Sequence, residues 1–213
     1  MDSLLLLSVL LGLYFAFNIA ANDIGNSMGT AVGSGALSMK RALLLGALFA
    51  FLGALFFGGN VTRTLGEGII PSDVFNVIAG FAVILTAALW ITITLLHGIP
   101  ISGSDAMVSA VIGVGLVSVG WTDMNLNTIT YIILSWISSP IIGLFSGFLT
   151  YYIIRAGIIR RVRSVSVKDR LEKLFAYLQV LSSSFSAFNV GALDFGVAMG
   201  VLFILSGGSS SFL

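Results

Sequence analysis

The chain has 213 residues and a formal net charge of +1; 57% of its residues are hydrophobic and only 9% are charged. A soluble domain is about 45–50% apolar and about 25% charged, so this composition argues against a water-covered globular protein. Ten basic and nine acidic residues leave no basic footprint for nucleic acid, and the absence of Cys excludes disulfides and thiolate metal sites. The composition and the mean hydropathy of +1.07 indicate an integral membrane protein.

Long apolar windows without charge predict the helices that cross the membrane, each of which needs about 20 residues. In chain order the windows cover residues 3–22, 42–62, 74–104, 106–122, 124–154, 174–193 and 195–213. The first window lacks a basic start, and we interpret it as a retained span rather than a signal peptide. The windows are continuously apolar rather than alternating, which favours helices over strands. We therefore expect an all-α, polytopic transmembrane helix bundle that includes broken or re-entrant helices.

The distribution of Lys and Arg predicts the orientation of these spans. Basic residues are concentrated between 155 and 173, and Lys40 and Arg41 mark a second basic turn. We expect both in the cytoplasm, with five crossings between an outside N-terminus and the basic loop, in a multi-pass protein of the cell membrane. We interpret the basic loop as a topology signal; a binding site for anionic membrane lipid is the alternative.

Residues 17–29 recur at 188–200 with an offset of 171, and seven of the thirteen positions are identical. An odd number of crossings between the copies would place them upside down relative to one another, as in the inverted repeats of secondary transporters. We expect a first transmembrane repeat at 1–154, a basic cytoplasmic loop at 155–173, and the beginning of a truncated or degenerate second repeat at 174–213.

Asp23 lies about 20 residues into an apolar window, where a carboxylate costs about 2.5–3.5 kcal/mol on insertion scales. Asn22 and Asn26 flank it, and a Gly-rich run follows, which predicts a helix broken at residues 22–26 that holds a hard cation such as Na⁺. The alternative is a polar clamp between packed helices. The second copy keeps the carboxylate as Asp194, a possible second site, but has lost both Asn residues.

A second break is predicted at residues 97–105, where Pro100 and two glycines end one helix before the next begins. Ser102, Gly103 and Ser104 then stand at a helix start, where hydroxyl and free N–H groups can receive an anion. For Asp105 we expect a capping role.

Three motifs resemble, in order, the signatures of the inorganic phosphate transporter family. They are Ala-Asn-Asp followed by Asn and Gly-Thr-Ala-Val-Gly-Ser within 21–37, Gly-Ile-Pro-Ile-Ser-Gly-Ser-Asp from 98, and Trp-Ile-Ser-Ser-Pro at 136–140. The resemblance implies phosphate symport with Na⁺ or H⁺ as coupling ion and no other cofactor. The phosphate-binding candidates are Asn22, Asn26, Ser102, Gly103 and Ser104. The sodium-binding candidates are Asp23, Asn22 and Asn26.

The sequence departs from the family pattern where Gly103 and Asp105 replace a Thr and a His, and an extra anion there could change the substrate or the coupling ion. Family members are also roughly twice this length. A second copy or a complementary half-transporter chain could supply the missing half.

Three other functions compete with phosphate symport. They are sulfate transport within the same family, a non-transporting half-size membrane subunit, and an anion channel, which the Asp23 carboxylate disfavours. An enzyme is not expected, because the chain contains no phosphate-binding loop, no Ser/His/Asp set in a supporting context and no metal-ligand spacing.

Overall fold

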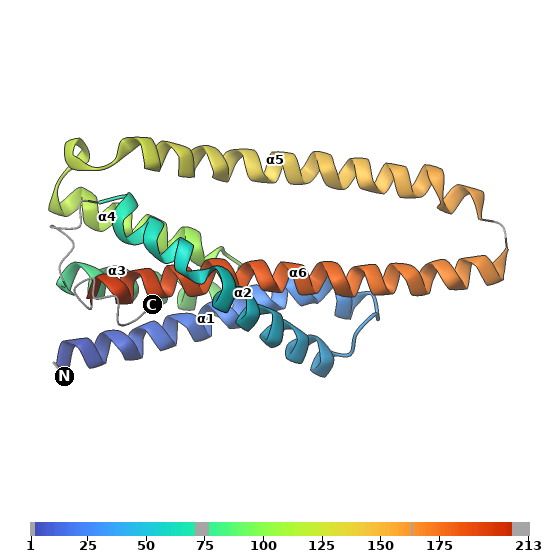
Figure 1. Cartoon of the computed structure of the whole chain (residues 1–213), viewed down its shortest axis with the longest axis horizontal. Coiled ribbons are helices and arrows are strands. Elements are labelled where there is room, and N and C mark those ends of the chain that lie inside the picture. The colour runs from blue at the N-terminus through green and yellow to red at the C-terminus, as the bar shows by residue number, and fades with distance from the viewer. Residues whose placement is uncertain (1–2, 71–76, 163, 206–213) are drawn as a thin grey trace.

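The computed structural model describes residues 3–70, 77–162 and 164–205, and every regular element in these ranges is a helix, as predicted (Figure 1). The elements in chain order are α1 Ser3–Gly33, α2 Met39–Gly68, α3 Val77–Leu96, α4 Gly103–Ser118, the short 3₁₀ helix η1 Trp121–Asp123, α5 Leu126–Gly157, the short 3₁₀ helix η2 Ile159–Arg161, and α6 Val165–Leu205.

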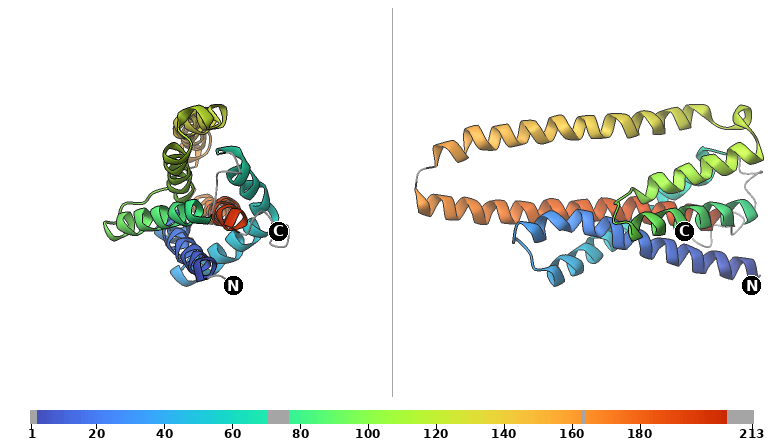
Figure 2. Two further views of the ribbon diagram at one scale, coloured as in Figure 1. Left: turned by 90° about the vertical axis from the view of Figure 1, so that its left-hand side faces the viewer. Right: turned by 180° about the vertical axis from the view of Figure 1, so that it is seen from behind.

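Successive long helices alternate in direction along the longest axis of the molecule, as the predicted crossings require (Figure 1). Helices α3 and α4 form a hairpin that enters and leaves at the N-terminal end and turns back part-way along the bundle (Figure 2). Since α4 has 16 residues, it is about 24 Å long, less than the roughly 30 Å of a bilayer's hydrocarbon. The hairpin fits the predicted re-entrant element, and three helices, α1, α2 and α5, then remain as crossings before the basic loop instead of the predicted five.

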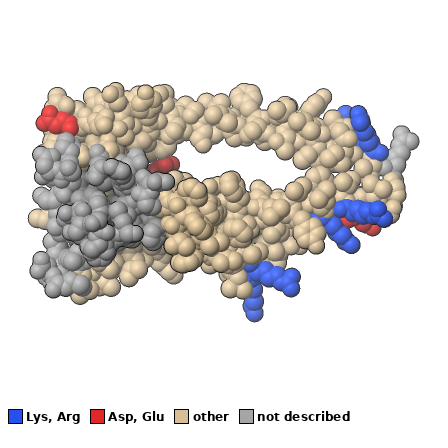
Figure 3. All heavy atoms as spheres, viewed as in Figure 1, with Lys and Arg blue, Asp and Glu red and all other residues tan. Residues whose placement is uncertain are grey.

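Three stretches among the described residues are long and apolar enough to cross a membrane: Met39–Gly58, Ile78–Leu96 and Leu126–Arg161. Helices α1 and α6 carry the two copies of the repeated polar motif, and they pack against one another inside the bundle. Lys and Arg side chains gather toward one end, at the start of α2 and where α5 meets α6 (Figure 3). This arrangement agrees with the predicted shared cytoplasmic side.

The predicted break at residues 22–26 is wrong, because α1 is continuous from Ser3 to Gly33. The segment contains no Pro, so no residue in it lacks a backbone donor. Gly25 and Gly29 each weaken the helix by about 1 kcal/mol but do not interrupt it. The polar residues of the motif are thus side chains on a helix surface, not parts of an unwound loop.

Two further boundaries differ from the predictions. Asp194 does not separate two spans, because α6 is continuous over its 41 residues; its carboxyl group is turned toward α1 instead of ending the helix. The basic loop expected at 155–173 is also shorter, since α5 continues to Gly157 and α6 begins at Val165. Most of its basic residues lie on helix ends. Residues 206–213, included in the last window, lie outside the described residues.

The α3–α4 hairpin turns at a helix C-terminus stabilised by Gly98, whose φ of 68° suits a residue without a Cβ. The N–H of Gly98 donates to the Leu95 carbonyl at 3.0 Å, and the N–H of Ile99 donates to the Thr94 carbonyl at 2.9 Å. These two bonds form a Schellman motif, and Pro100 follows where the helix has already stopped.

Two hydrophobic clusters hold the bundle. The larger joins α1 to the hairpin through side chains such as Phe15, Ile91 and Met107, all fully buried. The smaller joins α1, α2 and α6 through Met28, Ala42 and Ala187. The hairpin is thereby fixed against the middle of α1, which decides where the start of α4 lies.

Helices α2 and α6 cross at glycines on both sides. A Cβ atom on Gly53 would collide with the carbonyl group of Phe188, and one on Gly191 would collide with the backbone of Ala50. Small residues of this kind let membrane helices approach backbone to backbone. The crossing therefore sets the position of α6, including that of Asp194 three residues further on.

Gly191→Ala should destabilise the protein by about 1–3 kcal/mol, because the new methyl group forces α2 and α6 apart. The matched control is Gly143→Ala on α5, where a Cβ has nothing within 4 Å. The measurement is the thermal unfolding temperature of each purified variant in detergent. Equal unfolding temperatures for the two variants would contradict the close crossing.

Candidate functional site

Three elements meet at the carboxylate of Asp23: α1 itself, α6 and the N-terminus of α4. The Asp23 carboxylate accepts a hydrogen bond from the backbone N–H of Gly103, the first residue of α4, and another from the side chain of Asn26. The carboxyl group of Asp194 lies within hydrogen-bonding reach of it, and Asp105 lies close enough to interact electrostatically. The two copies of the repeated motif thus meet at their shared aspartate.

Asp194 is buried, with 9% of the residue exposed. Its Oδ2 atom has no hydrogen-bond partner within the described part of the chain. Two ionised carboxylates have no hydrogen to share, so contact between Asp23 and Asp194 leaves that oxygen unsatisfied. A buried acceptor without a partner is unusual in proteins and calls for a proton or a cation. Asp194, predicted as a possible second site, therefore belongs to the same site as Asp23.

Asn22 and Asn26 have different surroundings. Asn22 is buried, and its Nδ2 donates to the backbone carbonyl of Ile101, just before α4. This bond ties α1 to the returning arm of the hairpin. Asn26 is exposed and its side chain bonds Asp23. Of the predicted cation ligands, Asp23 and Asn26 come together, whereas the amide nitrogen of Asn22 serves the packing of the hairpin.

The first turn of α4 is capped by Ser102, whose Oγ accepts from the backbone N–H of Asp105 at 3.3 Å. The Ser102 and Ser104 hydroxyls lie 3.1 Å apart. The expectation that Asp105 caps this helix is therefore wrong: Asp105 lies inside the first turn, so it supplies the donor and Ser102 the acceptor. Gly103 is buried against Ile19, whose side chain leaves no room for a Cβ there.

A cavity of about 1070 Å³ lies between α3 and α4 and reaches this first turn. Ser102 and Asp105 line its inner part, and Ser109 continues the same face of α4 toward the outer end. Gly103 and Ser104 are not among its lining residues. The cavity brings open space to two of the polar groups at the α4 N-terminus.

Polar contacts continue along the α1–α6 interface beyond the aspartates. The Gln179 Nε2 donates to the Thr30 Oγ1 at 2.7 Å, and the Ser186 and Ser27 hydroxyls are 3.2 Å apart. Gln179 and Ser186 were not predicted as site residues, and the signal for them was their polarity inside an apolar window. These contacts form a polar clamp between α1 and α6, but Asp23, which the alternative prediction places in such a clamp with a Ser or Asn, takes no part in them.

The donor set favours a small hard cation over a transition metal. Across the described residues, no three His, Cys, Asp or Glu side chains converge to hold a metal ion. The ligands at hand are carboxylate and amide oxygens, which suit hard cations. These groups lie where two motif copies on antiparallel helices meet. Secondary transporters with inverted repeats have their ligand sites at such a place.

The sequence profile of the phosphate transporter family matches residues 19–210, so the chain belongs to that family, one of multi-pass membrane transporters rather than enzymes. A protein of Pyrococcus abyssi named as a candidate phosphate permease is 33% identical over 221 residues, covering 96% of this chain and 54% of that protein. Inorganic phosphate transporter 2-1 of Arabidopsis thaliana, a chloroplastic protein, is 38% identical over 154 residues, covering 70% and 26% respectively. The chain spans about half the length of the archaeal relative.

A solved structure described as the sodium-dependent phosphate transporter has the same fold as this chain. The TM-score is 0.80 at 24% sequence identity, over 99% of this chain and 69% of that one. The similarity extends through all the elements that form the site, from α1 to α6. The predicted fold class is thereby confirmed as a helical membrane bundle.

A chain carrying Asp23→Cys and Asp194→Cys should be joined efficiently by a short bifunctional thiol reagent, because the two side chains meet. The chain has no native Cys, so the two introduced thiols are the only targets. Cross-linking followed by protease cleavage between the sites reports the bond on a gel. The control pair Asp23→Cys with Asp123→Cys should stay unlinked, since η1 lies at the N-terminal end; equal linking of both pairs would contradict the contact.

Proposed function

We propose that this chain binds inorganic phosphate together with a cation, Na⁺ or H⁺, and moves both across the membrane by symport. The observation that carries the proposal is the contact of Asp23 with both Asp194 and the N-terminus of α4. That contact brings the candidate cation site, between the two carboxylates, next to the candidate anion site at the first turn of α4. Membership of the phosphate transporter family supports phosphate as the anion.

The cation is proposed to lie between Asp23 and Asp194. Their carboxylates face each other, and the Oδ2 of Asp194 is a buried acceptor with no hydrogen bond from the described residues. One positive charge shared between them would satisfy that oxygen and offset the repulsion of two anions in a medium of low dielectric constant. The Asn26 side chain lies at the same place and donates a hydrogen bond to the Asp23 carboxylate.

Phosphate is proposed to bind at the first turn of α4. Ser102 and Ser104 offer hydroxyl groups, and the α4 N-terminus adds free N–H groups and the positive end of the helix dipole. The Gly103 N–H already donates to the Asp23 carboxylate, and Asp105 adds a second negative charge nearby. An anion can therefore approach only when a cation neutralises the carboxylates.

Such dependence of one ligand on the other is the coupling that symport needs, because affinity for each must change when the other binds. The membrane potential makes the same demand. Each elementary charge moved through 100 mV gains or loses about 2.3 kcal/mol, so an anion enters a negative compartment uphill unless cations accompany it. When the bound cations carry more charge than the phosphate, the membrane potential favours entry of the two ligands together.

Asp23→Asn should abolish cation-dependent uptake of radiolabelled phosphate into proteoliposomes, because one of the two cation-binding carboxylates is lost. Asp123→Asn is the matched control: it removes an exposed carboxylate from η1 and should leave uptake unchanged. Uptake by Asp23→Asn equal to that of the unmodified chain would show that Asp23 does not bind the coupling cation. Uptake of radiolabelled sulfate that excess unlabelled phosphate does not inhibit would identify a sulfate permease instead. No phosphate binding under any Na⁺ or pH condition would indicate a non-transporting subunit.

Ser104→Ala should raise the KM for phosphate by about 10-fold or more, since a hydrogen bond to a charged group contributes about 1.5–3 kcal/mol. The concentration of cation that gives half-maximal uptake at saturating phosphate should stay the same. Ser118→Ala, at the opposite end of α4, serves as control. An unchanged KM would place phosphate away from the first turn of α4.

A further inference from the structure

The carboxylate of Asp105 is a hydrogen-bond acceptor without a donor. Asp105 is half-buried in the first turn of α4, and its backbone N–H donates to the Ser102 Oγ at 3.3 Å. Its side chain forms no hydrogen bond or ion pair with any residue that the structure describes. An ionised carboxylate only accepts hydrogen bonds, so Asp105 offers free acceptor oxygens beside the candidate phosphate site.

The cavity between α3 and α4 reaches this carboxylate. Asp105 and Ser102 both line the inner part of the cavity, and the hydroxyls of Ser102 and Ser104 lie 3.1 Å apart. The hydroxyls and the backbone N–H groups at the start of α4 can donate to an anion, whereas Asp105 can only accept. An oxyanion at this turn therefore meets several donors and one acceptor side by side.

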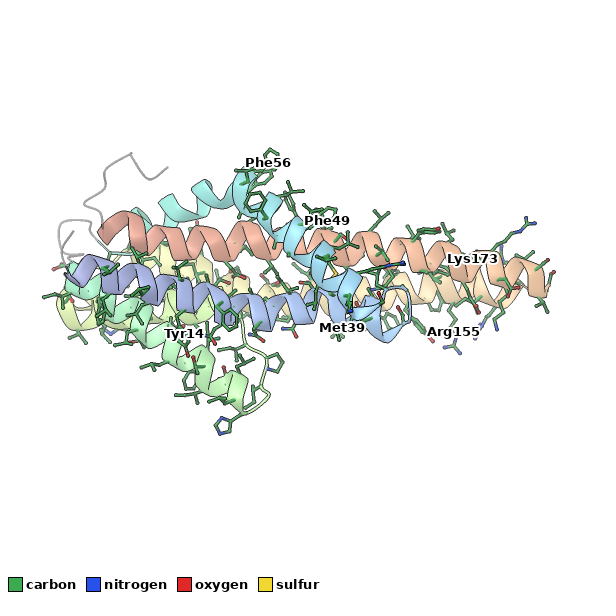
Figure 4. The ribbon with its side chains drawn as sticks, turned by 90° about the horizontal axis from the view of Figure 1, so that it is seen from below. Tyr14, Met39, Phe49, Phe56, Arg155 and Lys173 are labelled. Carbon is green, nitrogen blue, oxygen red and sulfur yellow. The ribbon has the colours of Figure 1, made fainter. Side chains whose placement is uncertain are left out.

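Contacts between α1 and the hairpin hold the first turn of α4 in place. The Tyr14 hydroxyl lies 2.8 Å from the Thr92 Oγ1 on α3, and Figure 4 shows Tyr14 against the hairpin. The Asn22 Nδ2 donates to the Ile101 carbonyl, and the first N–H of α4 donates to the Asp23 carboxylate. Binding groups on a fixed backbone discriminate between ligands, because the turn has little freedom to move away from one that fits badly.

Hydrogen phosphate and sulfate are tetrahedral dianions of nearly the same size, so neither shape nor charge separates them. They differ in one proton: near neutral pH phosphate carries at least one P–O–H group, whereas sulfate carries none. A fixed carboxylate can accept a hydrogen bond from the P–O–H group, but it meets only a bare, negatively charged oxygen of sulfate. Sites that hydrogen-bond a ligand's hydroxyl group reject analogues without it much more strongly than sites that rely on fit alone.

From this arrangement we propose that Asp105 is a specificity-determining residue, which selects phosphate against sulfate by accepting a hydrogen bond from the P–O–H group of the bound anion. Ser102 and Ser104 donate to the other phosphate oxygens. The inference rests on the proposed function, since it requires an anion at the first turn of α4. It also gives a reason for a negative side chain beside an anion site, because the carboxylate supplies the acceptor that a protonated oxyanion needs.

The test is equilibrium binding of radiolabelled phosphate to the full chain in detergent with Na⁺ near neutral pH, with unlabelled phosphate, arsenate or sulfate as competitor. Arsenate is protonated under these conditions, as phosphate is. The unmodified chain should bind phosphate and arsenate more tightly than sulfate. Asp105→Asn should lower the ratio of phosphate affinity to sulfate affinity by roughly 10-fold or more, because it loses a hydrogen bond to a charged group and gains an amide that can donate to sulfate.

Two further variants support the comparison. Ser109→Ala, one turn further along the face of α4 that lines the cavity, is the matched control and should leave the ratio unchanged. Asp105→Glu keeps an acceptor on a longer side chain and should retain the preference for phosphate over sulfate. Gel filtration checks that each variant folds.

The outcomes separate failure of this inference from failure of the proposed function. Phosphate that binds to the unmodified chain no more tightly than sulfate would overturn the inference. Equal changes in phosphate and sulfate affinity in Asp105→Asn would overturn it as well, because Asp105 would then act only through its charge. A changed Na⁺ requirement with an unchanged ratio would assign Asp105 to the cation instead. No binding of phosphate under any Na⁺ or pH condition would refute the proposed function itself, and the inference with it.

Discussion

A carboxylate inside a membrane must be neutralised or hydrogen-bonded, and the arrangement of this protein follows from how Asp23 meets that demand. Asp23 is half-buried on α1, so water solvates its carboxylate only in part. The structure surrounds it with the N-terminus of α4, the side chain of Asn26 and the carboxyl group of Asp194. The Gly103 N–H and the Asn26 side chain stabilise its negative charge, and a hydrogen bond between Asp23 and Asp194 requires a proton on one of the two carboxyl groups. The pair therefore needs a proton or a cation between its oxygens, and the proposed coupling follows from that requirement.

The same geometry also provides partners for the backbone N–H groups in the first turn of α4. The first N–H groups of a helix have no partner in the helix itself, and leaving them bare in hydrocarbon is costly. At the start of α4 the Ser102 hydroxyl binds one of these groups and the Asp23 carboxylate binds another. The start of the helix and the carboxylate therefore stabilise each other. A ligand that binds the Asp23 carboxylate or the N-terminus of α4 must therefore replace the hydrogen bond between them.

Several features of the fold could be predicted from the sequence because lipid permits so few alternatives. A long apolar stretch must satisfy its backbone within itself, so apolar windows became helices, and Gly98 with Pro100 set the turn of the hairpin. The repeat drew attention to Asp194, but no pattern could show that it touches Asp23. That contact depends on the α2–α6 crossing at Gly53 and Gly191, a property of two surfaces and not of one segment.

The wrong predictions have a common cause, namely that polar residues within an apolar segment were interpreted as interruptions of the helix. Glycine weakens a helix without ending it, and Asp23 and Asp194 are accommodated by turning toward each other while their helices continue. Asn22 was predicted to bind both ligands, and its Nδ2 donates to the Ile101 carbonyl, a contact between elements that its own segment cannot reveal. Side-chain chemistry identified the region, whereas the assembled bundle decided which of its groups lie together.

The unbroken course of α6 has a mechanical consequence. Asp194 lies 29 positions after Val165 on α6, which makes a rod of about 43 Å from the basic end to the carboxylate. A stiff rod transmits an axial push or a twist with little loss over such a length. A force applied to the basic end of α6 therefore reaches Asp194 directly, and that end provides a remote handle on the carboxylate pair.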